Sequence, residues 1–303
     1  MIELGIKSDA IEYRYSYEWF FDLMAEHGIK YMQLGSFFEM YSLEDDYFYN
    51  LKEKATERGL QIKSTFTAHR ELGGFFVGNL YMEKVARKNF EKFITIASIL
   101  GADYCGSNPG AVYRDKFYQK DDGISCYLSH MKELQHLAFE RGLKGLTMEP
   151  MSCMAEPPTT PAEMSYMIGT LNDYHKKNIL NTVPFYLCGD ISHGLANESQ
   201  QVIHSNMELF VHAIPMMAEF HFKNTDAIFS STFGFSDEEK QKGIVNLQDV
   251  KKIIETHLEL FPVKYPIGYL EISGPKTGRD YSDKLLRKSL SESLLALKNV
   301  FEK

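Results

Sequence analysis

Residues 185–194, FYLCGDISHG, contain a short apolar run that ends at the carboxylate of Asp190 and then turns through small polar residues. Such a run is typical of a strand buried in a parallel sheet. Residues 145–150, GLTMEP, have the same character and end near Glu149, and residues 161–176 between the two runs carry apolar side chains at helical spacing. This part of the chain therefore predicts a strand, a helix and a second, parallel strand.

The same alternation extends outward to both ends of the chain and occurs eight times. The predicted strands span residues 3–8, 31–35, 61–66, 103–107, 145–149, 185–190, 218–223 and 268–272. The predicted helices span residues 17–27, 46–58, 84–100, 125–141, 161–176, 207–214, 247–260 and 281–301. Eight such units without a linker-like segment predict an α/β fold, a single (β/α)8 TIM barrel that forms one domain over residues 1–303. An open doubly wound sheet is the competing architecture, but no GxGxxG phosphate loop follows the first strand.

Composition and net charge limit the kinds of partner that the chain is expected to bind. The chain has 41 acidic and 33 basic residues and a net charge of −8, which disfavours nucleic acid. The first residues lack the basic and apolar regions of a secretory signal, and the apolar run at residues 93–100 is too short to span a bilayer. Four scattered cysteines without CxxC spacing indicate reduced thiols. We therefore expect a cytoplasmic protein with no membrane partner.

Polar residues at the ends of four predicted strands are the main candidates for chemistry, because a barrel builds its active site at the carboxyl ends of its strands. They are Glu149, Asp190, His221 and Glu271. If the faces that carry them point inward, three carboxylates and an imidazole converge, and such carboxylates would repel one another unless a cation lay among them. This donor set predicts one divalent metal ion, Mn²⁺, Mg²⁺ or Co²⁺, with Zn²⁺ as the alternative.

The segments GLTMEPM, CGDISHG, AEFHFKNTD and GYLEISG resemble the sugar isomerase and epimerase branch of the xylose-isomerase-like barrels, which includes ketose 3-epimerases and hydroxypyruvate isomerase. The resemblance implies that Glu149, Asp190, His221 and Glu271 bind one divalent metal. It also implies that Glu149 and Glu271 are catalytic, one removing a proton from a small ketose, ketose phosphate or related hydroxyketone to give an enediolate and the other returning it. Return to the same carbon gives an epimer, and return to its neighbour gives an isomer.

Three residues near these segments are candidates for substrate binding. His193 matches the DxxH histidine of the family, which the resemblance implies contacts a substrate oxygen. His69 follows the third strand, where this superfamily often places a site histidine. A histidine without a role in a surface loop is an almost equally good interpretation. Lys223 is expected on the face of His221, where it could pair with a substrate anion or simply neutralise Asp226 or Glu219.

Further substrate contacts are predicted in three loops. Asn108 follows the fourth strand, Glu156 lies in the proline-bearing loop after the fifth, and Arg279 lies after the eighth, where barrels often bind phosphate. Aromatic residues in other loops suit a wall against a sugar, core packing or the contact of a homo-oligomer equally well.

Other functions share this architecture. The segment after His221 differs from that of the ketose epimerases, which disfavours simple 3-epimerisation of a free ketohexose. A dehydratase or decarboxylase of a keto sugar or keto acid would use the same enediolate chemistry, and a barrel that only binds sugar remains a third interpretation. An endonuclease IV-like nuclease resembles the chain at several of the same residues, but the further histidine of the fourth strand and the DxH pair are absent from the sequence.

Overall fold

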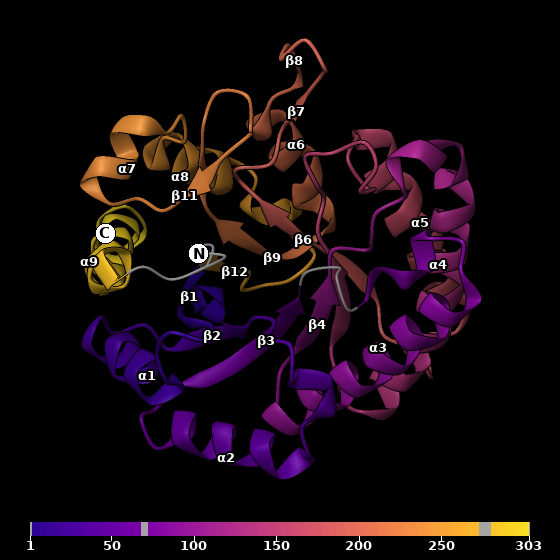
Figure 1. The fold of residues 1–303 in the computed structure, drawn as a ribbon, viewed down its shortest axis with the longest axis horizontal. Coiled ribbons are helices and arrows are strands. Elements are labelled where there is room, and N and C mark those ends of the chain that lie inside the picture. The colour runs from indigo at the N-terminus through magenta and orange to yellow at the C-terminus, as the bar shows by residue number, and fades with distance from the viewer. Residues whose placement is uncertain (1, 68–71, 273–279, 303) are drawn as a thin grey trace. The chain divides into compact units, whose positions relative to one another are not determined.

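The computed structural model describes residues 2–67, 72–272 and 280–302. Eight strands form a closed barrel in the order β1, β12, β9, β6, β5, β4, β3 and β2 (Figure 1). Their bounds are β1 Glu3–Lys7, β2 Tyr31–Leu34, β3 Gln61–Thr67, β4 Tyr104–Ser107, β5 Gly145–Met148, β6 Phe185–Asp190, β9 Met217–Phe222 and β12 Ile267–Leu270. The predicted (β/α)8 barrel is confirmed, with each strand within one or two residues of its expected ends.

Helices follow the barrel strands as expected. They are α1 Tyr17–Glu26, α2 Asp45–Thr56, α3 Leu80–Leu100, α4 Lys120–Glu140, α5 Pro161–Lys177, α6 Asn206–Ala213, α7 Asp237–Lys242, α8 Leu247–Thr256 and α9 Asp280–Phe301. Two short hairpins, β7 Leu195–Ala196 with β8 Val202–His204 and β10 Asn224–Thr225 with β11 Thr232–Phe233, lie in the loops after β6 and β9.

Helix boundaries differ from the predicted ones where polar residues cap the ends. The helix expected at residue 84 begins four residues earlier, because the Asn79 side chain accepts hydrogen bonds from the backbone N–H groups of Tyr81 and Met82. The helix expected from residue 125 begins at Lys120, and the one expected to reach residue 260 ends at Thr256, with a 3-10 turn after it. These changes lengthen or shorten helices without moving a barrel strand.

The contacts within the chain divide it into two compact units. The first unit comprises Met1–Gly35, Asn50–Ile62 and Gly189–Lys303, and the second comprises Ser36–Tyr49 and Lys63–Cys188. That residues 1–303 behave as one domain therefore stays a prediction. Among the described residues, no helix combines the length and apolar character needed to cross a membrane.

Strand pairing within each unit sets which side chains are neighbours. In the first unit β1 pairs in parallel with β12, so the N-terminal strand lies beside the C-terminal one as expected, and β12 pairs with β9 with Tyr269 opposite His221. In the second unit β4 pairs with β5 with Ser107 opposite Met148. The residues that follow these strands, Asn108 and Glu149 among them, are thereby brought side by side.

Candidate metal and substrate site

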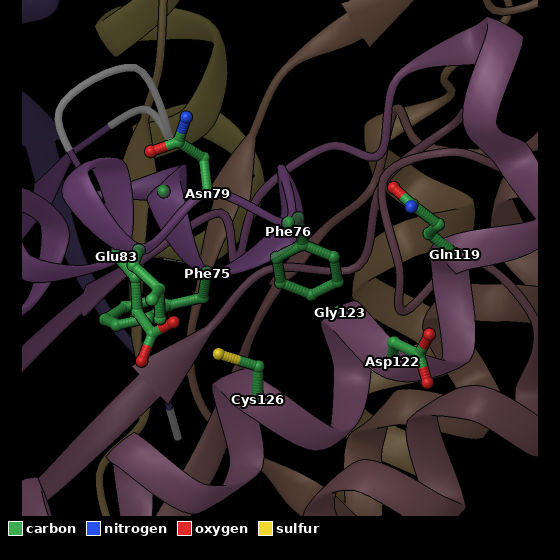
Figure 2. Close-up of a pocket in the computed structure, with 11 residues that line it drawn as sticks. Phe75, Phe76, Asn79, Glu83, Gln119, Asp122, Gly123 and Cys126 are labelled. Atoms are coloured by element: carbon green, nitrogen blue, oxygen red, sulfur yellow. The ribbon is translucent and has the colours of Figure 1, made fainter.

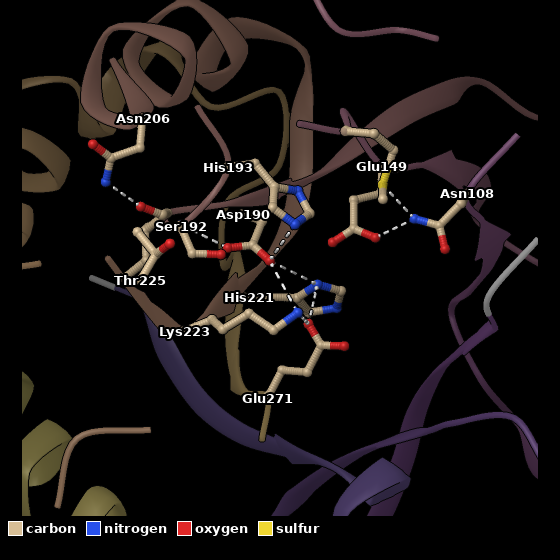
Figure 3. A network of polar contacts seen from close by, with 12 residues as sticks. Asn108, Glu149, Asp190, Ser192, His193, Asn206, His221, Lys223, Thr225 and Glu271 are labelled. Atoms are coloured by element: carbon tan, nitrogen blue, oxygen red, sulfur yellow. Dashed lines mark hydrogen bonds and ion pairs between the residues drawn. The ribbon is translucent and has the colours of Figure 1, made fainter. Parts of the chain in front are cut away.

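Three of the predicted ligands meet in the first unit. Asp190 is the last residue of β6, His221 lies in β9 and Glu271 follows β12. All three are buried, with 5%, 0% and 6% of their surface exposed. His221 Nδ1 lies 3.2 Å from Glu271 Oε2 and 4.0 Å from Asp190 Oδ2, and Figure 3 shows the three side chains directed toward one another. Strand register thus gathers two carboxylates around one ring nitrogen.

Gln33 at the end of β2 fixes the orientation of the His221 ring. Its side-chain Oε1 lies 2.7 Å from His221 Nε2, and both side chains are fully buried. Because a carbonyl oxygen can only accept, Nε2 carries a ring proton, and Nδ1 is the nitrogen that faces the carboxylates and that can bind a metal once it has given up its proton. A histidine that ligates a metal commonly donates its other ring N–H in this way.

Asp190 presents a second donor atom that fits a cation. Its Oδ1 accepts a hydrogen bond from the Ser192 backbone N–H at 2.7 Å. Its buried Oδ2 accepts no hydrogen bond from any residue that the structure describes, although His193 Nε2 lies 3.4 Å and Lys223 Nζ lies 3.6 Å away. A buried carboxylate oxygen without a donor is costly unless a cation approaches it. The residues therefore fit a divalent metal ion.

Two buried lysines bind the Glu271 carboxylate. Lys7 Nζ lies 2.8 Å from Oε1 and Lys223 Nζ lies 2.7 Å from Oε2. Burial would raise the pKa of Glu271, but the charges of Lys223, Lys7 and His221 outweigh it and hold the pKa well below its usual range. Lys7 also lies 3.0 Å from Asp9 Oδ2. Glu271 is thus an ionised carboxylate whose charge is shared between two ammonium groups.

Lys223 lies beside two carboxylates that the sequence did not suggest as its partners, those of Glu271 and Asp190. Asp226 instead closes the loop between β10 and β11, where its carboxylate accepts hydrogen bonds from the Ile228 and Ser230 backbone N–H groups and from the Ser230 hydroxyl. The side chain of Lys223 is directed to the carboxylates of Glu271 and Asp190 (Figure 3). Lys223 reaches these carboxylates because it lies two positions after His221 and therefore on the same face of the strand.

The fourth predicted ligand, Glu149, lies in the second unit. It follows β5, its side chain is buried, and its Oε2 accepts a hydrogen bond from Asn108 Nδ2. Asn108 follows β4 and also donates to the sulfur of Met151. Asn108 was predicted as a substrate contact, and the structure shows it bound to the Glu149 carboxylate.

The DxxH histidine is held by the loop after β6. His193 approaches Asp190, and its neighbour Gly194 lies under the ring of Phe229, so closely that a Cβ on Gly194 would be 2.3 Å from Phe229 Cζ. Phe229 itself adopts a left-handed backbone conformation, with φ of 62°. A bulky residue is held in this region only when its surroundings demand it.

The other predicted contacts have different outcomes. Glu156, in the second unit, forms an ion pair with Arg114 at 3.2 Å. His69 and Arg279 lie outside the described residues. Lys7 and Gln33 were not predicted, and the one signal for them in the sequence is their position at or near the carboxyl ends of β1 and β2.

No protein-family model matches the chain, and no curated protein matches it either. Solved structures do. A candidate xylose isomerase from Rhodospirillum rubrum matches over 99% of both chains at 18% identity, with a TM-score of 0.79. A D-psicose 3-epimerase from Clostridium cellulolyticum H10, solved with D-tagatose, matches over 99% of both chains at 11% identity and a TM-score of 0.70.

A candidate 3-DHS dehydratase of petrobactin synthesis from Bacillus anthracis also matches over 99% of both chains, at 12% identity and a TM-score of 0.66. At these identities the likeness concerns the course of the chain, from the first barrel strand to the last. The chain therefore has the fold of the xylose-isomerase-like (β/α)8 barrels, as the four segments in its sequence indicated.

Proposed function

We propose that this chain is a divalent-metal-dependent isomerase or epimerase that acts on a small ketose, ketose phosphate or related hydroxyketone. The observation that carries the proposal is the direction of the donor atoms: His221 Nδ1 faces one oxygen of Asp190 and one of Glu271, while Gln33 binds the other ring nitrogen. Sugar epimerases among the proteins of similar fold support it.

Glu149 is proposed as the fourth ligand. It follows β5, the neighbour of β6 in the barrel, and it is as buried as the other three residues. We propose that Glu149, Asp190, His221 and Glu271 together supply the ligands of one ion. Three carboxylates and one imidazole suit Mn²⁺, Mg²⁺ or Co²⁺ better than Zn²⁺. Such an ion would polarise the substrate carbonyl and make the neighbouring C–H bond more acidic.

The two glutamates are proposed to divide the proton transfer unequally. Asn108, a neutral amide, orients the Glu149 carboxylate, whereas two ammonium groups bind Glu271. A carboxylate paired with cations is a weaker base, so Glu149 is assigned the removal of the substrate proton. Glu271 completes the proposed acid/base pair, and Lys223 places a positive charge beside the oxygen on which negative charge develops.

A lyase is the second candidate, because of the same lysine. Lys223 Nζ lies within 3.6 Å of both Asp190 and Glu271 carboxylate oxygens, and a buried ammonium group there can protonate a departing hydroxyl group. Dehydration removes water from the enediolate that epimerisation would reprotonate. A candidate dehydratase is among the proteins of similar fold.

Solvent-proton exchange separates these possibilities. C3 to C6 ketoses, their phosphates and keto acids would be incubated with the enzyme and Mn²⁺ in deuterated water and followed by NMR. An isomerase or epimerase incorporates deuterium at the α-carbon and its substrate loses no fragment. A lyase instead releases water or carbon dioxide from the substrate. The absence of exchange and of elimination across the whole set, with Mn²⁺ bound, would contradict both proposals.

Glu149→Gln and Glu271→Gln test the roles of the two residues. With metal saturating, each change should lower turnover by about two to four orders of magnitude, the usual worth of a positioned base. His193→Ala should be milder because it removes one polar contact. Glu208→Gln, on the exposed start of α6, is the matched control and should leave turnover unchanged. If both site variants exchange the α-proton at the wild-type rate, the glutamates are ligands only.

A further inference from the structure

A group of metal-binding side chains lies in the second unit, on the helices outside β3 and β4. Glu83 stands in the first turn of α3, and Cys126 and His130 stand one turn apart on α4. Each offers one donor atom, and the three atoms lie within 4.8 Å of one another. All three side chains are partly buried.

We propose that Glu83, Cys126 and His130 bind a zinc-type divalent cation. Sulfur, imidazole nitrogen and carboxylate oxygen are the donors that Zn²⁺ takes in proteins. Residues four apart on a helix share a face, so Cys126 and His130 can ligate one ion from the same helix. Bond lengths of about 2.0–2.3 Å place tetrahedral ligand atoms roughly 3.3–3.8 Å apart. The observed spacing reaches this arrangement with small side-chain movements.

The hydrogen bonds of the cluster show where the ion would lie. His130 Nε2 is 2.8 Å from Glu83 Oε1, so in the metal-free protein a proton bridges the two atoms. A cation with a thiolate ligand would replace that proton and the proton of the thiol. The bound cation would then carry two negative ligands, Glu83 and Cys126, which match its charge.

Arg87 contacts the far side of the imidazole. Arg87 Nη1 lies 3.3 Å from His130 Nδ1 and is itself paired with the carboxylates of Glu91 and Glu133. Because guanidinium can only donate, metal binding at Nε2 requires the ring proton to move to Nδ1 and Arg87 to turn aside toward Glu91 and Glu133, with which it is already paired. The Arg87 charge is cancelled by the two carboxylates, so it opposes the cation only weakly.

A cavity beside the cluster has room for the remaining coordination position. It holds about 250 Å³ and is lined by Glu83 and Cys126 together with the rings of Phe75 and Phe76. Figure 2 shows the Cys126 sulfur directed toward the Glu83 carboxylate. The Phe75 ring lies over His130 with 4.6 Å between ring centroids, which fixes the imidazole plane. Water in the cavity can complete a four-coordinate site.

A role for Cys126 as a nucleophile is disfavoured. Burial and the Glu83 carboxylate raise the pKa of its thiol to about 11, so near neutral pH the sulfur carries its proton. The metal proposal rests on the three donors and their spacing, and it is independent of the chemistry proposed for the barrel site, whose four ligands include no sulfur.

Cobalt absorption tests the proposal, because a charge-transfer band in the near ultraviolet arises only when a thiolate ligates Co²⁺. Titration of the full-length, metal-free protein with Co²⁺ in excess of both proposed sites should produce this band at the intensity of one thiolate-bound ion per chain. Cys126→Ser should abolish it. Cys153→Ser, which removes another partly buried cysteine of the same unit, is the matched control and should keep it. Asp190→Asn should keep it as well, which separates this site from the barrel site.

Two outcomes would overturn the proposal: no band with Co²⁺ in excess of both sites, or a band that persists in Cys126→Ser. Glu83→Gln keeps the thiol and tests the cluster if the cysteine variant does not fold. It should keep the band but weaken Co²⁺ binding by at least about tenfold, since even the loss of an outer partner of a metal ligand costs that much. A wild-type affinity in this variant would exclude the carboxylate ligand.

Discussion

Replacing Gln33 by leucine tests whether the His221 ring is set up to bind metal. Gln33 contacts the imidazole at Nε2, on the side away from the carboxylates, at a distance of 2.7 Å. Leucine has a similar volume and fits a fully buried position, so the substitution removes an acceptor without opening a large cavity. The proton can then move to Nδ1, the atom that faces Asp190 and Glu271, where it would block the lone pair.

We expect Gln33→Leu to lose more Mn²⁺ affinity than its loss of folding stability can explain. Outer partners of metal ligands are worth about 10- to 100-fold in affinity, or about 1.4–2.7 kcal/mol. Loss of one buried hydrogen bond costs about 1–3 kcal/mol of folding free energy. Calorimetric titration of Mn²⁺ into the metal-free protein measures the first quantity, and urea unfolding in the presence of a chelator measures the second.

Gln135→Leu is the matched control. Gln135 is also fully buried, and its amide donates to the Val183 carbonyl at 2.8 Å. It should lose a similar amount of stability and keep the wild-type Mn²⁺ affinity. The reasoning is refuted if Gln33→Leu binds Mn²⁺ as tightly as the wild type, or if both variants lose affinity equally, since the effect would then come from weakened folding.

Three further outcomes are expected. Lys223→Gln removes a cation that competes for Glu271 Oε2 and should strengthen Mn²⁺ binding; it should also raise the acid-unfolding midpoint of the metal-free protein in a circular dichroism titration. Because its pKa is lowered in the folded protein, the Glu271 carboxylate stabilises the fold above about pH 4.5. This stabilisation is lost as the pH falls through the folded-state pKa, and that pKa is higher without Lys223. Gly194→Ala should cost about 1–3 kcal/mol in urea unfolding, because the new Cβ would meet the Phe229 ring, and Phe229→Ala in the same chain should remove the steric part of that cost. Cys126 should be alkylated far more slowly in the native than in the denatured protein at pH 8, since a pKa of about 11 in place of 9.0 reduces the thiolate fraction about a hundredfold; equal rates by peptide mass spectrometry would contradict the buried, carboxylate-bound thiol.

Barrel strands were predictable because their signal is local. A parallel strand covered on both faces must be apolar on both, and every residue of β9 is buried, the polar Glu219 and His221 included. Helix starts were less predictable. The start of α3 depends on Asn79, whose side chain caps the helix ahead of the first regularly spaced apolar residues.

The candidate ligands on the later strands were found because each places a carboxylate or an imidazole at or near the end of an apolar run. Lys7 and Gln33 escaped because a lysine or glutamine at the end of a strand gives no sign of metal chemistry when it is considered alone. Their meaning comes from register: β1 lies beside β12, which brings Lys7 to Glu271, and the barrel brings Gln33 to His221. Spacing within one strand contains no information about such a pair.

The two lysines also change the reason for expecting a metal. Considered from the sequence, clustered carboxylates required a cation to offset their repulsion, and charge alone led to the ion. In the structure Lys7 and Lys223 already supply two positive charges to Glu271, so charge balance no longer distinguishes a metal site from a buried ion-pair network. What distinguishes them is the direction of lone pairs. An ion-pair network satisfies its carboxylates with N–H donors, yet Asp190 Oδ2 accepts no hydrogen bond from the described residues, and Gln33 binds Nε2 of His221 so that Nδ1 faces the carboxylates.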